Sequence, residues 1–137
     1  MVHYRHSYHA GNFADVFKHA LLVGLLQALS RKDKPWCFVE SHAGAGTYDL
    51  EAEGALRTGE AQDGIARLTD AQGAPPAAAR YLEIVRAASA GGAARRYPGS
   101  PAVALAMARP GDRLVLCEKV PEVAQALKYA LRDPRVT

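Results

Sequence analysis

The sequence predicts an α/β fold that contains the first strands of a doubly wound parallel sheet. An apolar run at Trp36–Val39 ends in Glu40 and is followed by a glycine-rich turn. A second apolar run, Leu114–Cys117, also ends in an acid, Glu118. Helical patterns separate the two runs, and short continuous apolar runs are typical of strands in a parallel sheet that helices cover.

A long helix is expected before the first strand. Asn12 is a plausible N-cap, and Asp15 is well placed against the positive end of the helix dipole. The helix should run to about Ser30, and the cations and proline of residues 31–35 should end it. Six apolar residues predict a wide buried stripe along it: Val16, Phe17, Ala20, Leu21, Val23 and Leu26.

The stretch from Tyr48 to Gly99 predicts a small helical insertion, because glycines and prolines interrupt it repeatedly. Two helical patches are expected within it, at residues 60–69 and 77–90. After the insertion, Ser100 is expected to cap a helix with Pro101 at its first position. Pro121 should open one more helix, and residues 135–137 look like the approach to a third strand.

Three parts are therefore predicted. Residues 1–50 form an N-terminal arm, a helix and the first strand with its turn, residues 51–99 form the helical insertion, and residues 100–137 continue the sheet domain. One flank of the first strand has no partner in this sequence, and an uncovered apolar strand edge is an aggregation liability. We therefore expect the chain to be an incomplete piece of a longer protein.

Length and composition exclude several classes of protein. The 137 residues allow at most one ordinary domain, and a hydrophobic content of 49% excludes a wholly disordered chain. The net charge of +3 and the pI near 9.0 are compatible with a polyanionic partner. Cys37 and Cys117 are expected to be buried free thiols. The absence of a signal-peptide pattern and of a membrane-spanning apolar stretch favours a cytoplasmic protein.

The glycine turn and Glu118 are the first candidate site. Gly44 and Gly46 remove side chains where the backbone must bend or approach a ligand closely. An acid at the end of the second strand can accept hydrogen bonds from ribose hydroxyls, although Glu118 lies much farther from the turn than the ~20 residues of a dinucleotide fingerprint. His42 is expected either to donate to the ligand or to fix the loop. Ser100 would bring a hydroxyl and a helix N-terminus towards the same crevice, and capping alone also explains it.

The N-terminal segment is rich in histidine and tyrosine. His3, His6 and His9 suggest zinc by their spacing, but no cysteine or carboxylate stands nearby to complete a tetrahedral site, so a metal is not expected. Aromatic rings next to cations fit RNA better, because rings stack on bases while cations meet phosphates. The alternative is an arm that packs on the core with its charges in solvent.

Several motifs occur in an order that points to one family. The longest is Tyr-Arg-His-Ser-Tyr-His-Ala-Gly-Asn-Phe-Ala-Asp-Val-Phe-Lys-His at residues 4–19, and others lie at 32–35, 42–46, 57–60, 64–67 and 97–101. Together they strongly resemble the bacterial 23S ribosomal RNA adenine-N6 methyltransferases of the J type, over the whole chain. The resemblance implies a Rossmann-like class I methyltransferase fold, incomplete here, with a helical insertion after the first strand and S-adenosylmethionine as the cofactor.

The resemblance also implies roles for individual residues. The cofactor contacts carried over are Lys18, His19, His42, Gly44, Gly46, Ser100 and Glu118. Tyr4 and His6 are implied to meet the substrate, 23S ribosomal RNA. The full-length enzyme is implied to be a monomer that uses no metal.

One departure from the family concerns catalysis. The family's Asp-Pro-Pro-Tyr motif, whose polar groups would accept hydrogen bonds from the adenine amine, does not occur in this sequence. Asp133-Pro134-Arg135 has no second proline and no aromatic residue, and the family's Asp-Gly pair near the cofactor adenine is also missing. We therefore expect no methyl transfer by this chain alone.

Two other functions are considered. A non-catalytic RNA-binding module would show salt-dependent RNA binding without affinity for S-adenosylmethionine. A dinucleotide-binding oxidoreductase fragment would need an acid at a strand end about 20 residues after the glycine turn. Glu60 and Asp63 lie nearest to that distance, but glycines flank them and they are not expected in a strand.

Overall fold

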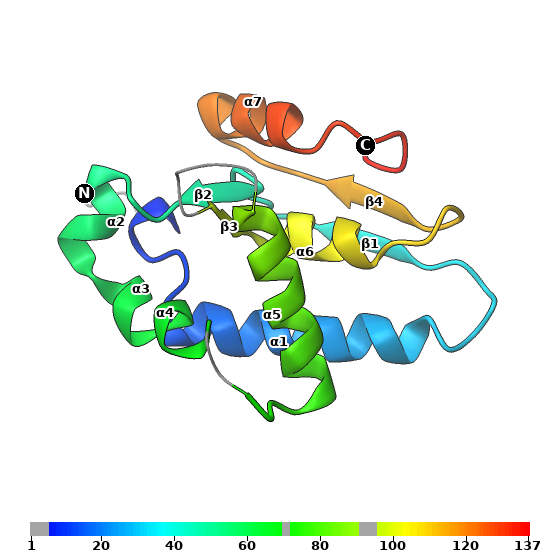
Figure 1. Ribbon diagram of the computed structural model, residues 1–137. Coiled ribbons are helices and arrows are strands. Elements are labelled where there is room, and N and C mark those ends of the chain that lie inside the picture. The colour runs from blue at the N-terminus through cyan, green and yellow to red at the C-terminus, as the bar shows by residue number, and fades with distance from the viewer. Residues whose placement is uncertain (1–5, 70–71, 91–95) are drawn as a thin grey trace.

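Two short strands lie side by side, and helices pack against them (Figure 1). The computed structural model describes residues 6–69, 72–90 and 96–137. The strands are β1 (Cys37–Glu40), β2 (Thr47–Asp49), β3 (Arg96–Pro98) and β4 (Arg113–Leu116). The helices are η1 (His6–Tyr8), α1 (Phe13–Leu29), α2 (Glu53–Thr58), α3 (Glu60–Asp63), α4 (Ile65–Leu68), α5 (Pro76–Ser89), α6 (Ser100–Met107) and α7 (Pro121–Ala130).

The predicted parallel pair is confirmed. β1 and β4 run parallel, with Phe38 opposite Leu114 and Glu40 opposite Leu116. Val136 forms a parallel bridge to Leu114 on the other side of β4, so the expected third strand begins there. This side-by-side order of parallel strands is the start of a doubly wound sheet.

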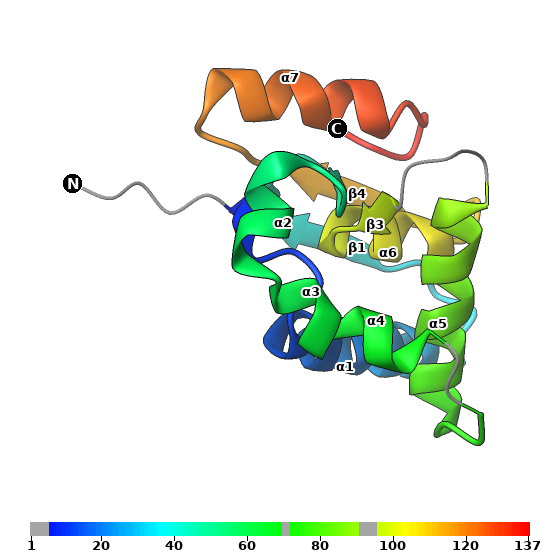
Figure 2. The ribbon, with the colours of Figure 1, turned by 60° about the vertical axis from the view of Figure 1, so that its left-hand side comes forward.

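Three helices cover one face of the pair, and α6 lies between α7 and α1 in both views (Figures 1 and 2). Leu26 of α1, Ala104 of α6 and Leu114 of β4 form one buried cluster, with Phe38 of β1 packed against it. Leu127 of α7 belongs to a second cluster nearby. Helices on this face bury the apolar side chains that the strands direct towards them.

The described residues leave the opposite face of the strands uncovered, which corrects the prediction that both cysteines are buried. Side chains alternate along a strand, so Cys37 and Val39 face away from the covering helices. Both are exposed, and Val39 is 67% exposed. Cys37 and Cys117 are free thiols as expected, but both are exposed, so the prediction that they are buried was wrong.

Helix α1 begins and ends close to the predicted positions. Asn12 caps it by accepting a hydrogen bond from the Asp15 amide, as expected. Val16, Val23 and Leu26 are buried, as predicted.

The predicted stripe on α1 was too wide. Phe17 is 64% exposed and Leu21 is 58% exposed. They lie four residues apart and share a second helix face, which points away from the residues that pack against Val16 and Val23. The apolar pattern was therefore read correctly as helical, but only one of its two faces is covered by the described residues.

The middle of the chain forms helices, as predicted. The patch expected at residues 60–69 is divided into α3 and α4 by Gly64, and α5 fills the second patch. Figure 2 shows α2, α3 and α4 in succession, from the level of the strands to that of α1. The antiparallel pairing of β2 with β3 was not predicted. It joins the segment that enters this helical region to the segment that leaves it.

These helices also hold the N-terminal segment. The Ile65 amide donates to the Gly11 carbonyl over 2.9 Å, and Asn12 donates to the Glu60 carboxylate over 2.9 Å. His9 lies 2.9 Å from the other Glu60 oxygen. The hydrogen bonds from Asn12 and His9 lower the pKa of the Glu60 carboxyl. The segment before α1 is therefore fixed against the insertion.

Ser100 does not cap α6, so that prediction was wrong. The cap position is Gly99, and Ser100 is the first helical residue, followed by Pro101. The Ser100 hydroxyl instead donates a hydrogen bond to Glu40. Ser100 lies in the first turn of α6 rather than at the cap position, and its hydroxyl donates a charge-assisted hydrogen bond to the carboxylate that ends β1.

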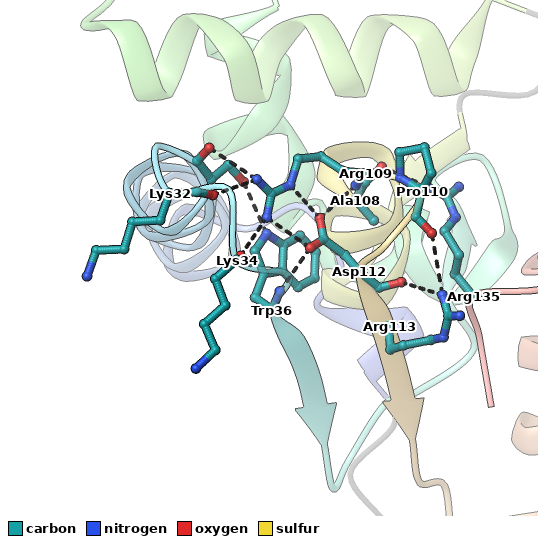
Figure 3. A network of polar contacts seen from close by, with 10 residues as sticks. Lys32, Lys34, Trp36, Ala108, Arg109, Pro110, Asp112, Arg113 and Arg135 are labelled. Atoms are coloured by element: carbon teal, nitrogen blue, oxygen red, sulfur yellow. Dashed lines mark hydrogen bonds and ion pairs between the residues drawn. The ribbon is translucent and has the colours of Figure 1, made fainter.

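A polar network joins the two loops at the amino ends of the strands (Figure 3). The Asp112 carboxylate is fully buried and accepts hydrogen bonds from the Trp36 amide and from Arg109. Arg109 also donates to the carbonyls of Lys32 and Lys34. The Arg109 hydrogen bond lowers the pKa of Asp112 to about 2. This network ties the segment before β1 to the segment before β4, and so supports their register.

Candidate functional site

The carboxyl ends of β1 and β4 are joined by backbone hydrogen bonds beyond the strands. The Cys117 amide donates to the Glu40 carbonyl over 2.8 Å, and the Ala43 amide donates to the Cys117 carbonyl over 2.9 Å. The glycine turn after β1 therefore lies directly beside the end of β4. In open α/β sheets, ligands bind at this end of the strands.

Glu118 contacts the glycine turn directly. One carboxylate oxygen accepts a hydrogen bond from the Gly44 amide over 3.0 Å, and the other accepts from the Val120 amide over 2.8 Å. The predicted acid and the predicted turn are thus brought together by a charge-assisted hydrogen bond. Each carboxylate oxygen has two lone pairs, so Glu118 keeps acceptor capacity for a ligand hydroxyl.

The turn requires glycine for two reasons. Gly44 has a φ of +66° and Gly46 a φ of +79°, in the left-handed region that favours glycine. A Cβ on Gly44 would also overlap the Tyr48 hydroxyl. That hydroxyl accepts a hydrogen bond from the Ala45 amide over 3.3 Å, and burial raises the pKa of Tyr48 to about 12. Tyr48 is therefore a neutral phenol that packs against Gly44 and accepts a hydrogen bond from the Ala45 amide.

Glu40 and Ser100 form the second polar pair at the strand ends. The Ser100 hydroxyl donates to one Glu40 oxygen over 2.6 Å. The other oxygen of Glu40 is buried and has no hydrogen-bond partner within the described residues. Burial raises the pKa of Glu40, although the Ser100 hydrogen bond and the charges of Lys18, His42 and His6 oppose that shift.

His19 is buried on α1, with 5% of its surface exposed. Its Nδ1 lies 2.9 Å from the hydroxyl of Tyr97, three residues before Ser100. Burial lowers the pKa of His19 to about 4, against the opposing charge of Asp15. The imidazole is therefore neutral near pH 7, with one nitrogen that donates and one that accepts.

Asp15 holds two of the predicted residues. Its carboxylate lies 3.0 Å from Nε2 of His6 and 3.2 Å from Nζ of Lys18. Burial would raise the pKa of Asp15, but His6, His19 and Lys18 together lower it to about 2. Lys18 is largely exposed, so its charge remains accessible to a ligand.

The structure places His42 and His6 differently. His42 is exposed, and its Nδ1 lies 2.9 Å from the Ser41 hydroxyl. His6, predicted to meet RNA, packs edge-on against the Tyr48 ring at a centroid distance of 5.1 Å. Tyr4 lies outside the described residues.

Two cavities are found elsewhere in the structure. A cavity of about 390 Å³ lies within the insertion, where Ile65 of α4 and Val85 of α5 line it. A smaller one of about 280 Å³ lies between α5 and α6. Neither is lined by Gly44, Gly46 or Glu118. The polar groups at the strand ends therefore define the candidate site.

Residues 6–69, 72–90 and 96–137 contain no group of three or more histidine, cysteine, aspartate or glutamate side chains arranged to hold a metal ion. No helix in the same described ranges has the length and apolar character needed to span a bilayer. The candidate site instead offers two carboxylates, a neutral imidazole, an exposed ammonium group and a backbone turn. Such a set suits a polar organic ligand with hydroxyl and charged groups.

Comparison with known families identifies the family of this chain. Residues 33–137 match the family described as ribosomal RNA large subunit methyltransferase D, RlmJ. The matched segment contains the glycine turn, Ser100 and Glu118. The chain belongs to the RlmJ family.

The chain is similar to RlmJ-family proteins in sequence, and it is similar in structure to a solved protein. Ribosomal RNA large subunit methyltransferase J of Escherichia coli is 44% identical over 88% of this chain, and that of Haemophilus influenzae is 38% identical over 98%. The chain covers 43% and 48% of those two proteins, so it spans about half the length of these curated relatives. A crystal structure of a Legionella pneumophila protein superposes with a TM-score of 0.82 at 37% identity, over 93% of this chain and 47% of that one.

Three residues of the candidate site are not among the predicted site residues. Glu40 belongs to the acid-and-glycine pattern that suggests a nucleoside-type cofactor, but the prediction does not include it among the site residues. Tyr48 and Tyr97 were seen as flanks of the insertion. Their roles depend on β2 and β3 pairing, for which the three-residue strands gave no sequence signal.

Substitution of Gly44 by alanine tests the fit between the turn and Tyr48. Gly59 is the matched control, because its φ of +65° nearly equals that of Gly44 and a Cβ there would meet nothing within 4 Å. Both variants carry the left-handed strain of about 1 to 2 kcal/mol. Gly44→Ala should lower the free energy of unfolding by roughly another 1 to 3 kcal/mol, because it displaces the Tyr48 hydroxyl. Urea denaturation measures both, and equal losses would contradict this packing.

The low pKa of His19 predicts a loss of stability in mild acid. The unfolded chain binds a proton at His19 near pH 6.5, whereas the folded chain binds it only near pH 4. The free energy of unfolding should therefore fall as the pH drops from about 6.5 to 4, by on the order of 3 kcal/mol from this group. His19→Gln should flatten that slope. The contribution of Asp15, with its pKa of about 2, is lost only at lower pH.

Urea denaturation at several pH values between 7 and 4 measures the slope for the wild type and His19→Gln. The slope, rather than the absolute stability, is compared because the substitution itself removes a buried hydrogen bond. Identical slopes would show that His19 titrates near its ordinary pKa in the folded chain.

Proposed function

We propose that this chain supplies the cofactor-facing part of an S-adenosylmethionine-dependent methyltransferase that acts on N6 of an adenine in 23S ribosomal RNA. Membership of the RlmJ family supports the class of reaction. The observation that carries the cofactor assignment is the hydrogen bond from the Gly44 amide to Glu118. It joins a side-chain-free turn to an acid at the adjacent strand end, which is the arrangement that nucleoside ligands use in open α/β sheets.

The fit between the site and the cofactor rests on complementary chemistry. Glu118 keeps lone pairs that can accept hydrogen bonds from ribose hydroxyls. Gly44 and Gly46 supply the left-handed backbone of the turn, which places the Gly44 amide against Glu118. When bound, S-adenosylmethionine would supply an electrophilic methyl group on a sulfonium.

The positively charged and donor groups are proposed to hold the amino-acid end of the cofactor. Lys18 is exposed and carries an ammonium group, and neutral His19 can donate one ring hydrogen bond. Ser100 and His42 are assigned to the same end, and the Ser100 hydroxyl is directed by Glu40. A carboxylate is the acceptor that such donors favour.

The N-terminal segment is proposed to meet the RNA. His6 is anchored to Asp15, which also binds Lys18, so the arm begins beside the proposed cofactor groups. Tyr4 is retained as an RNA-contacting residue on the family resemblance. The division of the chain into residues 1–50, 51–99 and 100–137 also remains a proposal. A ribosomal RNA substrate is compatible with the expected cytoplasmic location.

Binding of S-adenosylhomocysteine tests the cofactor assignment without turnover. Isothermal titration calorimetry should detect binding to this chain, and Glu118→Ala should weaken it about tenfold or more, because a carboxylate that accepts hydrogen bonds from a ligand is lost. Glu122→Ala removes the same charge from an exposed position on α7 and should leave the affinity unchanged. Unaltered affinity of Glu118→Ala, with the fold retained in its circular dichroism spectrum, would remove Glu118 from the site.

Methyl transfer by the purified chain is expected to be absent. The Asp-Pro-Pro-Tyr motif that would accept hydrogen bonds from the adenine amine does not occur in this sequence. Transfer of labelled methyl groups to unmodified 23S ribosomal RNA measures this directly, with the Escherichia coli relative as the positive control. Incorporation by this chain above background would show that the transfer does not require that motif.

A further inference from the structure

Two tyrosine hydroxyls and one histidine form a buried chain of hydrogen bonds. The Tyr81 and Tyr97 hydroxyls lie 2.8 Å apart, and the Tyr97 hydroxyl lies 2.9 Å from Nδ1 of His19. Tyr97 is 0% exposed and Tyr81 is 1% exposed, so neither hydroxyl can turn to solvent. Burial raises the pKa of both phenols, and each therefore keeps its single proton.

The count of protons decides the direction of these hydrogen bonds. If Tyr81 donates to Tyr97 and Tyr97 donates to Nδ1 of His19, every hydroxyl proton in the chain has an acceptor. If Nδ1 carries the proton and donates to Tyr97, one of the two tyrosine protons has no acceptor among the described residues. A buried donor without an acceptor is costly, so the first arrangement is favoured.

The first arrangement leaves the His19 proton on Nε2. That nitrogen has no hydrogen-bond partner in the described ranges, and it is not among the fully buried atoms that lack one. A ring whose Nδ1 accepts internally therefore presents an N–H at its other nitrogen. The partner of one ring nitrogen sets the role of the other.

We propose that Tyr97 is a positioning residue that holds His19 as the Nε2–H tautomer, so that the ring donates a hydrogen bond to an acceptor oxygen of the bound cofactor. A carboxylate oxygen is the acceptor of matching chemistry. The cofactor part of this inference rests on the proposed function, whereas the tautomer of His19 does not.

The placement of Tyr97 connects His19 to the glycine turn. Tyr97 pairs with Tyr48 in the register of β3 and β2, and Tyr48 braces Gly44 and Ala45. Two residues after Tyr97, the Gly99 amide donates to the Gly46 carbonyl over 2.8 Å. One three-residue strand at the edge of the insertion therefore positions the histidine and the turn together.

The two tyrosines provide a matched pair of variants. The His19 ring lies 5.8 Å from the Tyr97 ring and 6.0 Å from the Tyr81 ring, so phenylalanine at either position keeps the aromatic packing. Tyr97→Phe removes the donor to Nδ1. Tyr81→Phe removes an equally buried hydroxyl. His19 Nδ1 then remains as the acceptor for the Tyr97 proton.

Long-range ¹H–¹⁵N spectra of the histidine rings in this chain report the tautomer. The wild type and Tyr81→Phe should show the Nε2–H pattern for His19, and Tyr97→Phe should lower the ratio of Nε2–H to Nδ1–H about tenfold. An Nδ1–H pattern in the wild type would overturn the proposal. So would an unchanged ratio in Tyr97→Phe, which would mean that Tyr97 has only a packing role.

Titration with S-adenosylhomocysteine separates this inference from the proposed function. Tyr97→Phe should weaken the affinity about fivefold, and Tyr81→Phe should not. If Tyr97→Phe changes the tautomer but leaves the affinity unchanged, the donation from His19 to the cofactor is overturned while the tautomer assignment is supported. Absence of binding to the wild type would refute the proposed function, and the tautomer result would still decide the role of Tyr97.

Discussion

The hydrogen bond between Glu118 and the Gly44 amide is the contact on which the candidate site depends. It exists because β1 and β4 are parallel neighbours, so that their carboxyl ends reach the same edge of the sheet. The Asp112 network at the other end of the strands keeps that register. Without the pairing, the acid and the glycine turn would have no reason to meet, since 74 residues separate them.

The other polar groups are attached to this contact by helices and by the insertion. Ser100 reaches Glu40 because α6 begins beside the end of β1, and His19 reaches Tyr97 because α1 packs against α5 and α6. The insertion therefore contributes directly to the arrangement of the candidate site. It supplies the strand that carries Tyr97 and the helices that hold the N-terminal segment.

Local patterns were enough to predict much of the fold. The cap at Asn12, the parallel strands and the helical insertion all follow from residues close together in the chain. Burial was harder, because the covered faces depend on what packs there: Phe17 and Cys37 look like core residues but lie on faces that the described residues leave open. The partner of Ser100 was missed for a similar reason, since the carboxylate that accepts from its hydroxyl lies 60 residues away in the chain.

The central claim is that a nucleoside-type cofactor binds where the ends of β1 and β4 meet. Amide chemical-shift mapping of this chain during titration with S-adenosylhomocysteine tests it most directly. The largest changes are predicted at residues 44–46 and 118–120, with smaller ones around His19 and Ser100. Changes confined to the cavity between α4 and α5, or spread evenly over the surface, would contradict it.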